Sequence, residues 1–404
     1  MTTSSVLATR LIGLNVFKET TFNTPAIPTA KMMGVQPLPS FSPKLKSTVF
    51  DEQRGTVVPG YLSANLMKGG AFNFNTHVTY EDILFLLAGG IKGSVAPTGG
   101  PVYTWPFPAP ITPYTPWNPQ TYTFEYGYDV GTIRAAGSVF DKITFKGEAS
   151  KQLEANVSGW YAGHDQNDAV AIASSTNATP IEITTATAHG YATGDTVIIG
   201  SHLVNTAANG TWTIIKTGAS TFTLNTSVGN GVGGATGTAT RAITQSIVDR
   251  TVEIAIVPPT TFWMDTAGVT PKTTQFANVM TSFQLDIETG LKPVYTGDSV
   301  SPTDFTYDAY KASLTLNLLF TQAVKAKLAA TAFAGIGNVF TLYFASGTKS
   351  IQMDFAGVLA DDPKEYESKD AAQVIPLKFD ARYDTGALAN FLKITVLNGV
   401  SAIP

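Results

Sequence analysis

Apolar and polar residues alternate strictly along several parts of this chain. A period of two is typical of a β-strand with one dry and one wet face, because successive side chains point to opposite sides. The apolar members are Leu153, Ala155 and Val157; Phe283, Leu285 and Ile287; Leu314, Leu316 and Leu318; Ile351, Met353 and Phe355; and Ile375, Leu377, Phe379 and Ala381. The pattern predicts a mainly β protein.

Two segments carry helix signals instead. The first follows Thr79, which can cap a helix, with Asp82 three residues on at the spacing of a capping box and Gly89 as a stop. The second follows Thr321, is rich in Ala, Lys and Leu, and ends at Gly335. We therefore expect two short helices within a β framework.

Three longer segments have a distinct character. Val139–Tyr161 predicts a long hairpin with a break near Gly147–Lys151. Pro101–Tyr126 is dense in proline and aromatic residues, which favours an extended arm lying over a sheet; the alternative is a ligand for a proline-recognising domain. Gln36–Gly60 has a weak strand signal, and segments of that length are usually functional or ordered by a partner.

Composition changes sharply between residues 169 and 242, where the only charged residues are Glu182, Asp195, Lys216 and Arg241. Short β-branched stretches at 180–185, 195–200, 210–217 and 220–225 are separated by turn sequences, and 229–240 is expected to form a flexible exit. We predict an inserted all-β module of five or six short strands at 169–242. It would divide a host domain into 1–168 and 243–404, and its ends must lie close together.

Charge and composition exclude several classes of structure and function. Apolar residues make up 44 % of the 404 residues, which excludes general disorder, whereas only 14 % are charged, which suggests that much of the surface meets other protein. The net charge of −4, without a basic stripe, argues against a nucleic-acid coat. The chain contains no cysteine, so disulfides and thiolate metal sites are excluded.

The sequence offers no targeting or membrane signal. Its opening residues lack a basic region before the apolar part, so they make a poor signal peptide. The longest apolar run, Ile83–Ile91, is much shorter than the ~20 residues that span a bilayer. We expect a chain made in the cytoplasm without membrane insertion.

Catalytic and metal-binding patterns are also missing. The four histidines show no ligand spacing, and His189 is expected in a solvated turn. Residues 164–168 (HDQND) could meet a cation, but a solvated loop is the favoured interpretation. Carboxylate pairs such as Asp286 with Glu288, or Asp361 with Asp362, are commonly just a polar face. We predict neither an enzyme nor a cofactor or metal site.

Seven segments follow one another in a distinctive order: ATRLIGLNVFKETTFNTPA (8–26), FDEQRGTVVPGYLSANLMKGGAFNF (50–74), YEDILFLLAGG (80–90), YTWPFPAPITPYTPWNPQTYTFEYG (103–127), FDKITFKGEASKQLEANVSGWY (140–161), SFQLDIETGLKPVYTGDS (282–299) and MDFAGVLADDP (353–363). Their order and spacing resemble those of the tail tube proteins of long, non-contractile-tailed bacteriophages. Within the insert, HGYATGDTV (189–197) and NTAANGTWTI (205–214) are similar to a small β-module found in phage tail proteins.

This resemblance implies a β-sandwich or half-barrel with a flanking α-helix, assembled into hexameric rings that stack into a hollow tube in the virion. The partners would be further copies of the chain and the tape measure, tail terminator and tail tip proteins. DNA would pass without specific binding, and assembly would occur in the host cytoplasm. The Gln36–Gly60 segment and the C-terminal residues 394–404 would bridge subunits.

A tube that passes DNA should present acidic or neutral polar residues to its bore, because phosphate must not adhere. The candidates for the lumen are Glu148, Glu154, Asp286 and Glu288. The alternative is that they face bulk water, and Lys142 and Lys146 on the first of these strands weaken the case for an acidic lumen.

The insert is expected on the outside of the tube. Tyr191 and Trp212 are its candidate surface contacts, although the favoured interpretation is that both belong to its small core. Two rival classes remain: a tail-tip or fibre-type receptor-binding protein with the insert as the host-binding module, and a tube protein of the type VI secretion system. A trimeric fibre would show shaft repeats, and none is visible.

Overall fold

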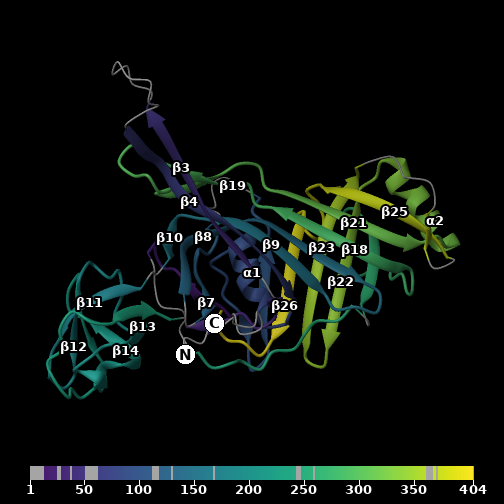
Figure 1. The fold of residues 1–404 in the computed structure, drawn as a ribbon. Helices are drawn as coiled ribbons and strands as arrows, with labels where there is room; N and C mark the ends of the chain where they lie inside the picture. The colour runs from purple at the N-terminus through teal and green to yellow at the C-terminus, as the bar shows by residue number, and fades with distance from the viewer. Residues whose placement is uncertain are drawn as a thin grey trace.

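The computed structural model describes residues 13–24, 29–36, 39–50, 62–111, 118–128, 131–166, 169–242, 247–257, 260–360, 367–369 and 372–403. Within these ranges the protein is mainly β, as the alternating pattern predicts, with two α-helices. A large antiparallel sheet and a small closed barrel contain most of the strands (Figure 1).

The strands of the large sheet come from both sides of the insert. They are β1 (Gly13–Lys18), β2 (Ala30–Lys31), β3 (Ser40–Phe50), β4 (Leu62–His77), β5 (Thr98–Gly99), β6 (Tyr103–Pro108), β7 (Tyr122–Tyr128), β8 (Gly131–Glu148), β9 (Glu154–Tyr161), β10 (Gly163–Gln166), β17 (Thr261–Thr266), β18 (Met280–Glu288), β21 (Lys311–Leu319), β22 (Asn338–Ser346), β23 (Lys349–Leu359), β24 (Glu367–Lys369), β25 (Ala372–Ala381) and β26 (Leu392–Asn398). Strands β19 (Leu291–Val294) and β20 (Asp304–Tyr307) form a separate hairpin.

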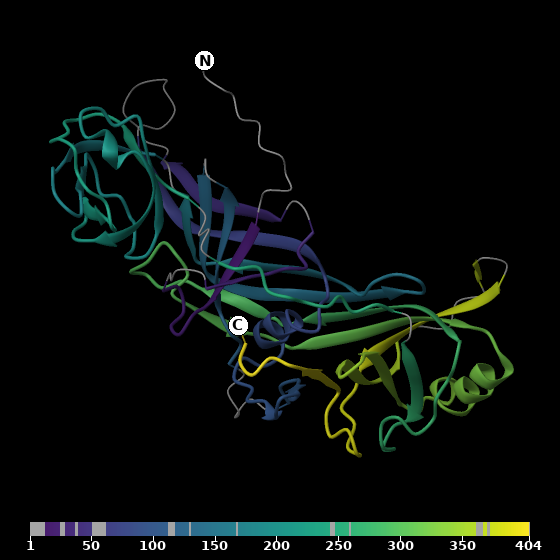
Figure 2. The same ribbon diagram turned by 90° about the horizontal axis from the view of Figure 1, so that it is seen from below.

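The large sheet folds over itself into two layers. The first layer has the order β3-β4-β9-β8-β18-β21-β25, and the second has the order β17-β22-β23-β26-β6. Strand β23 joins them, because its last residues, Gly357–Leu359, pair with β25. The apolar faces meet between the layers, where Phe340 packs on Phe379 with ring centroids 4.5 Å apart and Phe283 contacts Phe344. Figure 2 shows these strands from below.

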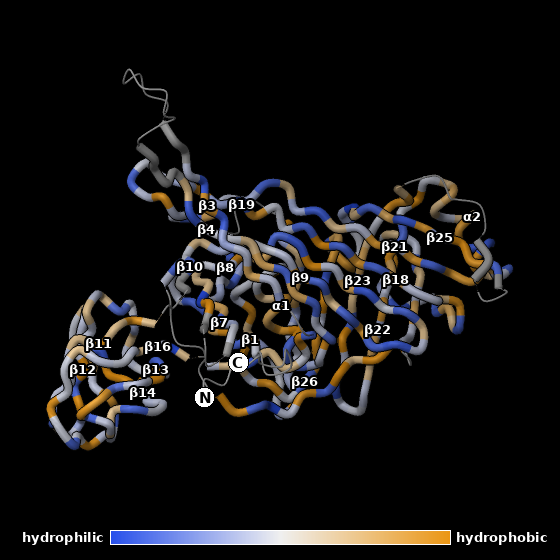
Figure 3. The backbone as a smooth tube through the Cα atoms, in the orientation of Figure 1, coloured by the Kyte–Doolittle hydropathy of each residue, from blue (hydrophilic) through white to orange (hydrophobic). Residues whose placement is uncertain are grey.

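Strand β8 belongs to two sheet regions. Its second half pairs with β9 and β18, whereas its first half pairs with β7 and β10, and β7 continues to β1 and β2. The hairpin predicted at Val139–Tyr161 is confirmed by the pairing of β8 with β9 and by the turn after Glu148. Figure 3 shows the alternation of hydrophilic and hydrophobic residues along the strands.

Helix α1 (Ile83–Gly90) is buried along its whole length. A Cβ atom on Gly89 would lie 2.6 Å from the ring of Phe140, and one on Gly90 would lie 2.3 Å from Cδ1 of Ile143. Both of these neighbours belong to β8. The two glycines therefore let the helix approach the inner face of the first layer more closely than any side chain would allow.

The predicted cap of α1 is half right. The hydroxyl of Thr79 accepts a hydrogen bond from the backbone N–H of Asp82 at 2.9 Å. The Asp82 carboxylate accepts instead from the Met33 N–H at 2.7 Å and pairs with Arg250. The Asp82 carboxylate thus links Met33 and Arg250 to the start of the helix rather than completing a capping box, and the helix ends one residue after Gly89.

The second helix agrees with its prediction. In α2 (Gln322–Ala330) the Thr321 hydroxyl accepts from the N–H of Val324 at 3.3 Å. A 3₁₀ turn, η3 (Ala332–Ala334), follows, and Gly335 closes it in the left-handed conformation at φ 72°. Glycine is favoured there because it has no Cβ to clash.

The structure differs from the sequence-based expectations for three extended segments. In its described parts, 101–111 and 118–126, the proline-rich segment belongs to the sheet instead of lying over it. Strand β6 pairs with β26 and, at Tyr103 and Thr104, with β5, and Trp105 and Phe107 on β6 are buried. The described part of Gln36–Gly60 contains the 11-residue strand β3, which forms a long hairpin with β4 that projects from the sheet (Figure 1). Residues 37–38 and 51–60 of this segment lie outside the described residues. Residues 394–398 of the C-terminal segment are not a free arm, because they belong to β26, which lies between β23 and β6 with Ile394 and Val396 buried.

The insert forms a closed barrel of six strands in the order β11-β12-β15-β14-β13-β16. Their bounds are β11 (Val170–Ser175), β12 (Glu182–Thr185), β13 (Thr196–Gly200), β14 (Gly210–Lys216), β15 (Thr221–Leu224) and β16 (Thr238–Arg241), with a 3₁₀ turn, η2 (Thr206–Ala208). The expected exit segment 229–240 instead ends in β16, which closes the barrel. Since Val170 pairs with Ala239, the first and last strands lie side by side.

Buried charges join the insert to the host sheet. The Nη2 atom of Arg134 on β8 lies 2.9 Å from a carboxylate oxygen of Glu125 on β7 and 2.9 Å from one of Asp195 in the insert. Arg241, at the end of β16, lies 3.9 Å from the same Asp195. All four side chains are at most 4 % exposed, so each charge depends on its partners.

Replacing Arg134 with methionine should therefore destabilise the protein by about 3–5 kcal/mol, because the carboxylates of Glu125 and Asp195 would lose the cation between them. Urea unfolding followed by circular dichroism measures this loss. The control is Lys216→Met, which removes an exposed cation from the same module and should change little. Equal stability of the two variants would show that these ion pairs do not hold the module.

Candidate functional site: a polar sheet face

The outward side of the first layer is polar across six adjacent strands, and we call it the polar face. The opposite sides of these strands are buried in the core. Its residues are Asn73 and Asn75 on β4; Glu154, Asn156 and Ser158 on β9; Lys142, Thr144, Lys146 and Glu148 on β8; Ser282, Gln284, Asp286 and Glu288 on β18; Lys311, Ser313, Thr315 and Asn317 on β21; and Lys378 and Asp380 on β25.

Strand register arranges these side chains in rows. One row runs Asn73, Ser158, Lys142, Glu288 and Lys311. The next runs Asn75, Asn156, Thr144, Asp286, Ser313 and Asp380, and a third runs Glu154, Lys146, Gln284, Thr315 and Lys378. Neighbours within a row are close enough to interact directly, so charges that are far apart in the sequence become partners.

Asp286 is the best-held charge on the polar face. Its carboxylate accepts hydrogen bonds from the Thr144 hydroxyl at 2.6 Å and the Gln284 amide at 2.7 Å, and it lies 3.3 Å from Nζ of Lys142. Burial by itself would raise the pKa of Asp286, but these hydrogen bonds and the lysine charge outweigh it, so the pKa is lowered. The side chain is 16 % exposed, which limits screening by solvent.

All four carboxylates proposed from the sequence for the lumen lie on the polar face. Glu288 is 3.5 Å from Nζ of Lys142 and Glu148 is 2.7 Å from Nζ of Lys151. Glu154 accepts from the side chain of Gln152 at 3.1 Å. The structure thus brings together residues separated by more than a hundred positions.

The face is not simply acidic. Five carboxylates, including Asp380, share it with four lysines, Lys142, Lys146, Lys311 and Lys378. Lys311 and Lys378 were not anticipated, because only the register of β21 against β18 and β25 places them there. Lys142, Glu288 and Lys311 alternate in sign along the first row, and with five carboxylates against four lysines the whole face is close to electrical neutrality.

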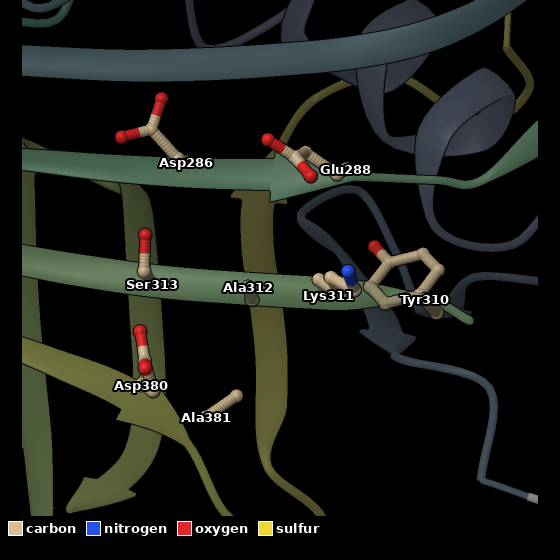
Figure 4. Close-up of a pocket in the computed structure, with 8 residues that line it drawn as sticks. All are labelled: Asp286, Glu288, Tyr310, Lys311, Ala312, Ser313, Asp380 and Ala381. Atoms are coloured by element: carbon tan, nitrogen blue, oxygen red, sulfur yellow. The ribbon is translucent and has the colours of Figure 1, made fainter. Parts of the chain in front are cut away.

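A hollow of about 450 Å³ lies on this face over β18, β21 and β25. Figure 4 shows Asp286, Ser313 and Asp380 in line across the three strands, with Glu288 and Lys311 beside them. Among the residues that the structure describes, no three His, Asp or Glu side chains are close enough together to hold a metal ion.

The insert candidates lie elsewhere. Tyr191 is 1 % exposed, donates its hydroxyl hydrogen to the carbonyl of Ala239 at 2.8 Å, and packs on Phe222. It is a core residue, so a surface contact is excluded and the favoured alternative was right. Trp212 is half-buried against the same core, and its Nε1 donates to the carbonyl of Ala208 at 2.8 Å.

The expectation of a solvated His189 is wrong. Its ring stacks on Tyr191 with centroids 4.7 Å apart and is 3 % exposed, because the turn folds back over the barrel core. Burial lowers the pKa of His189. A turn sequence alone gives no sign of this packing.

Comparisons with known proteins add no relative. No protein-family model matches the sequence, and no curated protein is significantly similar to it. Across the ranges that the structure describes, none of the helices has the length and apolar character needed to cross a membrane.

The lowered pKa of Asp286 predicts a specific pH dependence. A carboxyl group with a folded-state pKa below the ordinary 3.8 stabilises the fold fully above that value, and its contribution disappears as the pH falls through the folded-state pKa. The stability difference between the wild type and Asp286→Asn should therefore be constant from pH 7 to about 5 and shrink below 3.8.

Asp141, beside Lys142 on β8, provides a control of opposite sign. Burial, followed by the charge of Glu288, raises the pKa of Asp141, so its ionised form costs stability until the pH falls through that raised value. When the wild type and Asp141→Asn are unfolded across the same pH range, the free energy of unfolding of the wild type should rise relative to that of the variant as the pH falls. Identical pH profiles for the two variants would contradict both assignments.

Proposed function

We propose that this chain is a tail tube protein of a long, non-contractile phage tail. In this proposal repeated copies form hexameric rings, the rings stack into a hollow tube, and the polar face lines the bore through which DNA passes. The observation that carries the proposal is the polar face itself: a wide, one-sided surface of polar residues and charges of both signs with an apolar core behind it.

The sheet edges support assembly through β-structure. In the described part of the chain, β3 pairs with β4 alone, so one side of this 11-residue strand offers free backbone groups. The β3–β4 hairpin projects from the sheet (Figure 1). Leu45 on β3 is 59 % exposed. An exposed edge of this length invites pairing with another chain, which a ring of identical subunits would provide.

The charge balance of the polar face suggests how DNA would pass without adhering. Binding to DNA gains free energy when lysines replace the counterions of the phosphates. A lysine already paired with a carboxylate offers little net attraction, and the five carboxylates slightly outnumber the four lysines. The bore would thus be close to neutral, in place of the acidic lining that the sequence suggests.

The insert lies at one end of the molecule, beyond β10, in both views (Figures 1 and 2). In the proposed tube it would be displayed on the outside. The second candidate, a tail-tip or fibre-type receptor-binding protein, is favoured by one observation: buried ion pairs hold the module to the host sheet, as a binding module on a rigid platform would require.

Electron microscopy of the purified full chain tests the proposal. We expect long hollow filaments with stacked rings in negative stain, and two-dimensional classes should give the ring symmetry. Trimeric spikes would support the fibre-type candidate, and a protein that remains monomeric at high concentration would contradict the tube.

Removing residues 169–242 in favour of a short Gly/Ser linker should leave tube assembly intact. The ends of the module are adjacent through the Val170–Ala239 pair, and Arg134 keeps its partner Glu125 at 2.9 Å. Microscopy would give the tube and circular dichroism the folding control. A variant that folds but forms no tubes would show that the module takes part in assembly.

A further inference from the structure

Lys142 on β8 lies between two carboxylates of β18. Its Nζ atom is 3.3 Å from Asp286 and 3.5 Å from Glu288, and its side chain is 40 % exposed. Register places Glu288 directly opposite Lys142 on one side and directly opposite Lys311 on the other. One row of the polar face therefore reads lysine, glutamate, lysine.

The two carboxylates differ in how firmly they are held. Asp286 is fixed by Thr144 and Gln284, and its lowered pKa keeps it ionised. Glu288 is 54 % exposed, and its carboxylate accepts a hydrogen bond from Nζ of Lys142 at 3.5 Å. Lys142 thus lies within ion-pair distance of both carboxylates, and Glu288 also stands directly opposite Lys311 in the pairing of β18 with β21.

We infer that Asp286 and Glu288 mask Lys142 and Lys311 from phosphate, so that loss of these two carboxylate charges turns the polar face into a surface that binds duplex DNA without sequence preference. This rests on the proposed function, because the masked ligand is the cargo of the proposed tube. The binding itself is a property of one subunit and is measured without assembly.

The charge balance gives the expected size of the effect. With both carboxylates neutralised, three carboxylates remain on the polar face against four lysines. Lys142 and Lys311 would then stand unpaired two strands apart, about 10 Å from each other. Each lysine that newly contacts a phosphate should add ~0.9 to the slope of log affinity against log salt.

The test uses the full-length chain at a concentration at which it remains unassembled. Fluorescence anisotropy with two unrelated 30-base-pair duplexes measures affinity between 50 and 200 mM salt. Asp286→Asn/Glu288→Gln should bind both duplexes at least tenfold more tightly than the wild type at the lower salt, with a slope steeper by about 1–2.

A matched control separates masking from a general change of net charge. Glu182→Gln/Asp298→Asn makes the same two chemical changes on the insert and on the β19–β20 turn, away from the polar face. It should bind as the wild type does. Adding Lys142→Met to the double variant should remove about one unit of the salt slope.

The single variant Glu288→Gln serves as a second test if neutralising Asp286 disturbs the fold, because Glu288 is exposed. This variant should bind DNA about threefold more tightly than the wild type. The inference is overturned if the folded double variant binds no more tightly than the matched control, or if Lys142→Met leaves the gained affinity unchanged. Tube formation by the wild type is scored separately by microscopy. DNA binding by the variant without wild-type tubes would contradict the tube, whereas tubes without variant binding would contradict the masking.

Discussion

The six strands that carry the polar face each have one side buried in the core and the other side turned outward. Burial of Phe283, Leu285 and Ile287 on β18 fixes the register of that strand, because a slip by one residue would turn them to water. The same register then sets Asp286 and Glu288 beside Lys142. The arrangement of charges on the polar face is thus a consequence of the apolar packing behind it.

This dependence explains which parts of the molecule could be read from the sequence. Alternation located β9, β18, β21, β23 and β25, and local capping chemistry located both helices, because these signals lie within a few residues. The polar character of the four candidate carboxylates was also visible. Their convergence, and the presence of Lys311 and Lys378 among them, depended on pairing between strands far apart in the chain, which no local pattern reports.

Other features were not predicted from the sequence, also for physical reasons. Strand β3 has no clear alternation, since much of it lies in a projecting hairpin without a core to face. His189 lies in a turn sequence and yet is buried, because the turn folds back onto Tyr191 and Phe222. Arg134 and Asp195 are 61 residues apart, and only the docking of the insert makes them partners.

The closed barrel of the insert has a consequence for any protein that polymerises through its sheet. Every strand of the barrel has a paired neighbour on both sides, so none presents a border that is free along its whole length. Some seventy residues rich in β-structure can therefore be carried by each copy without competing for the contacts that join copies together. An open sheet of similar size would expose unpaired strand edges on each copy. Those edges could pair with other copies in place of the assembly contacts, and misdirected growth or branching would follow.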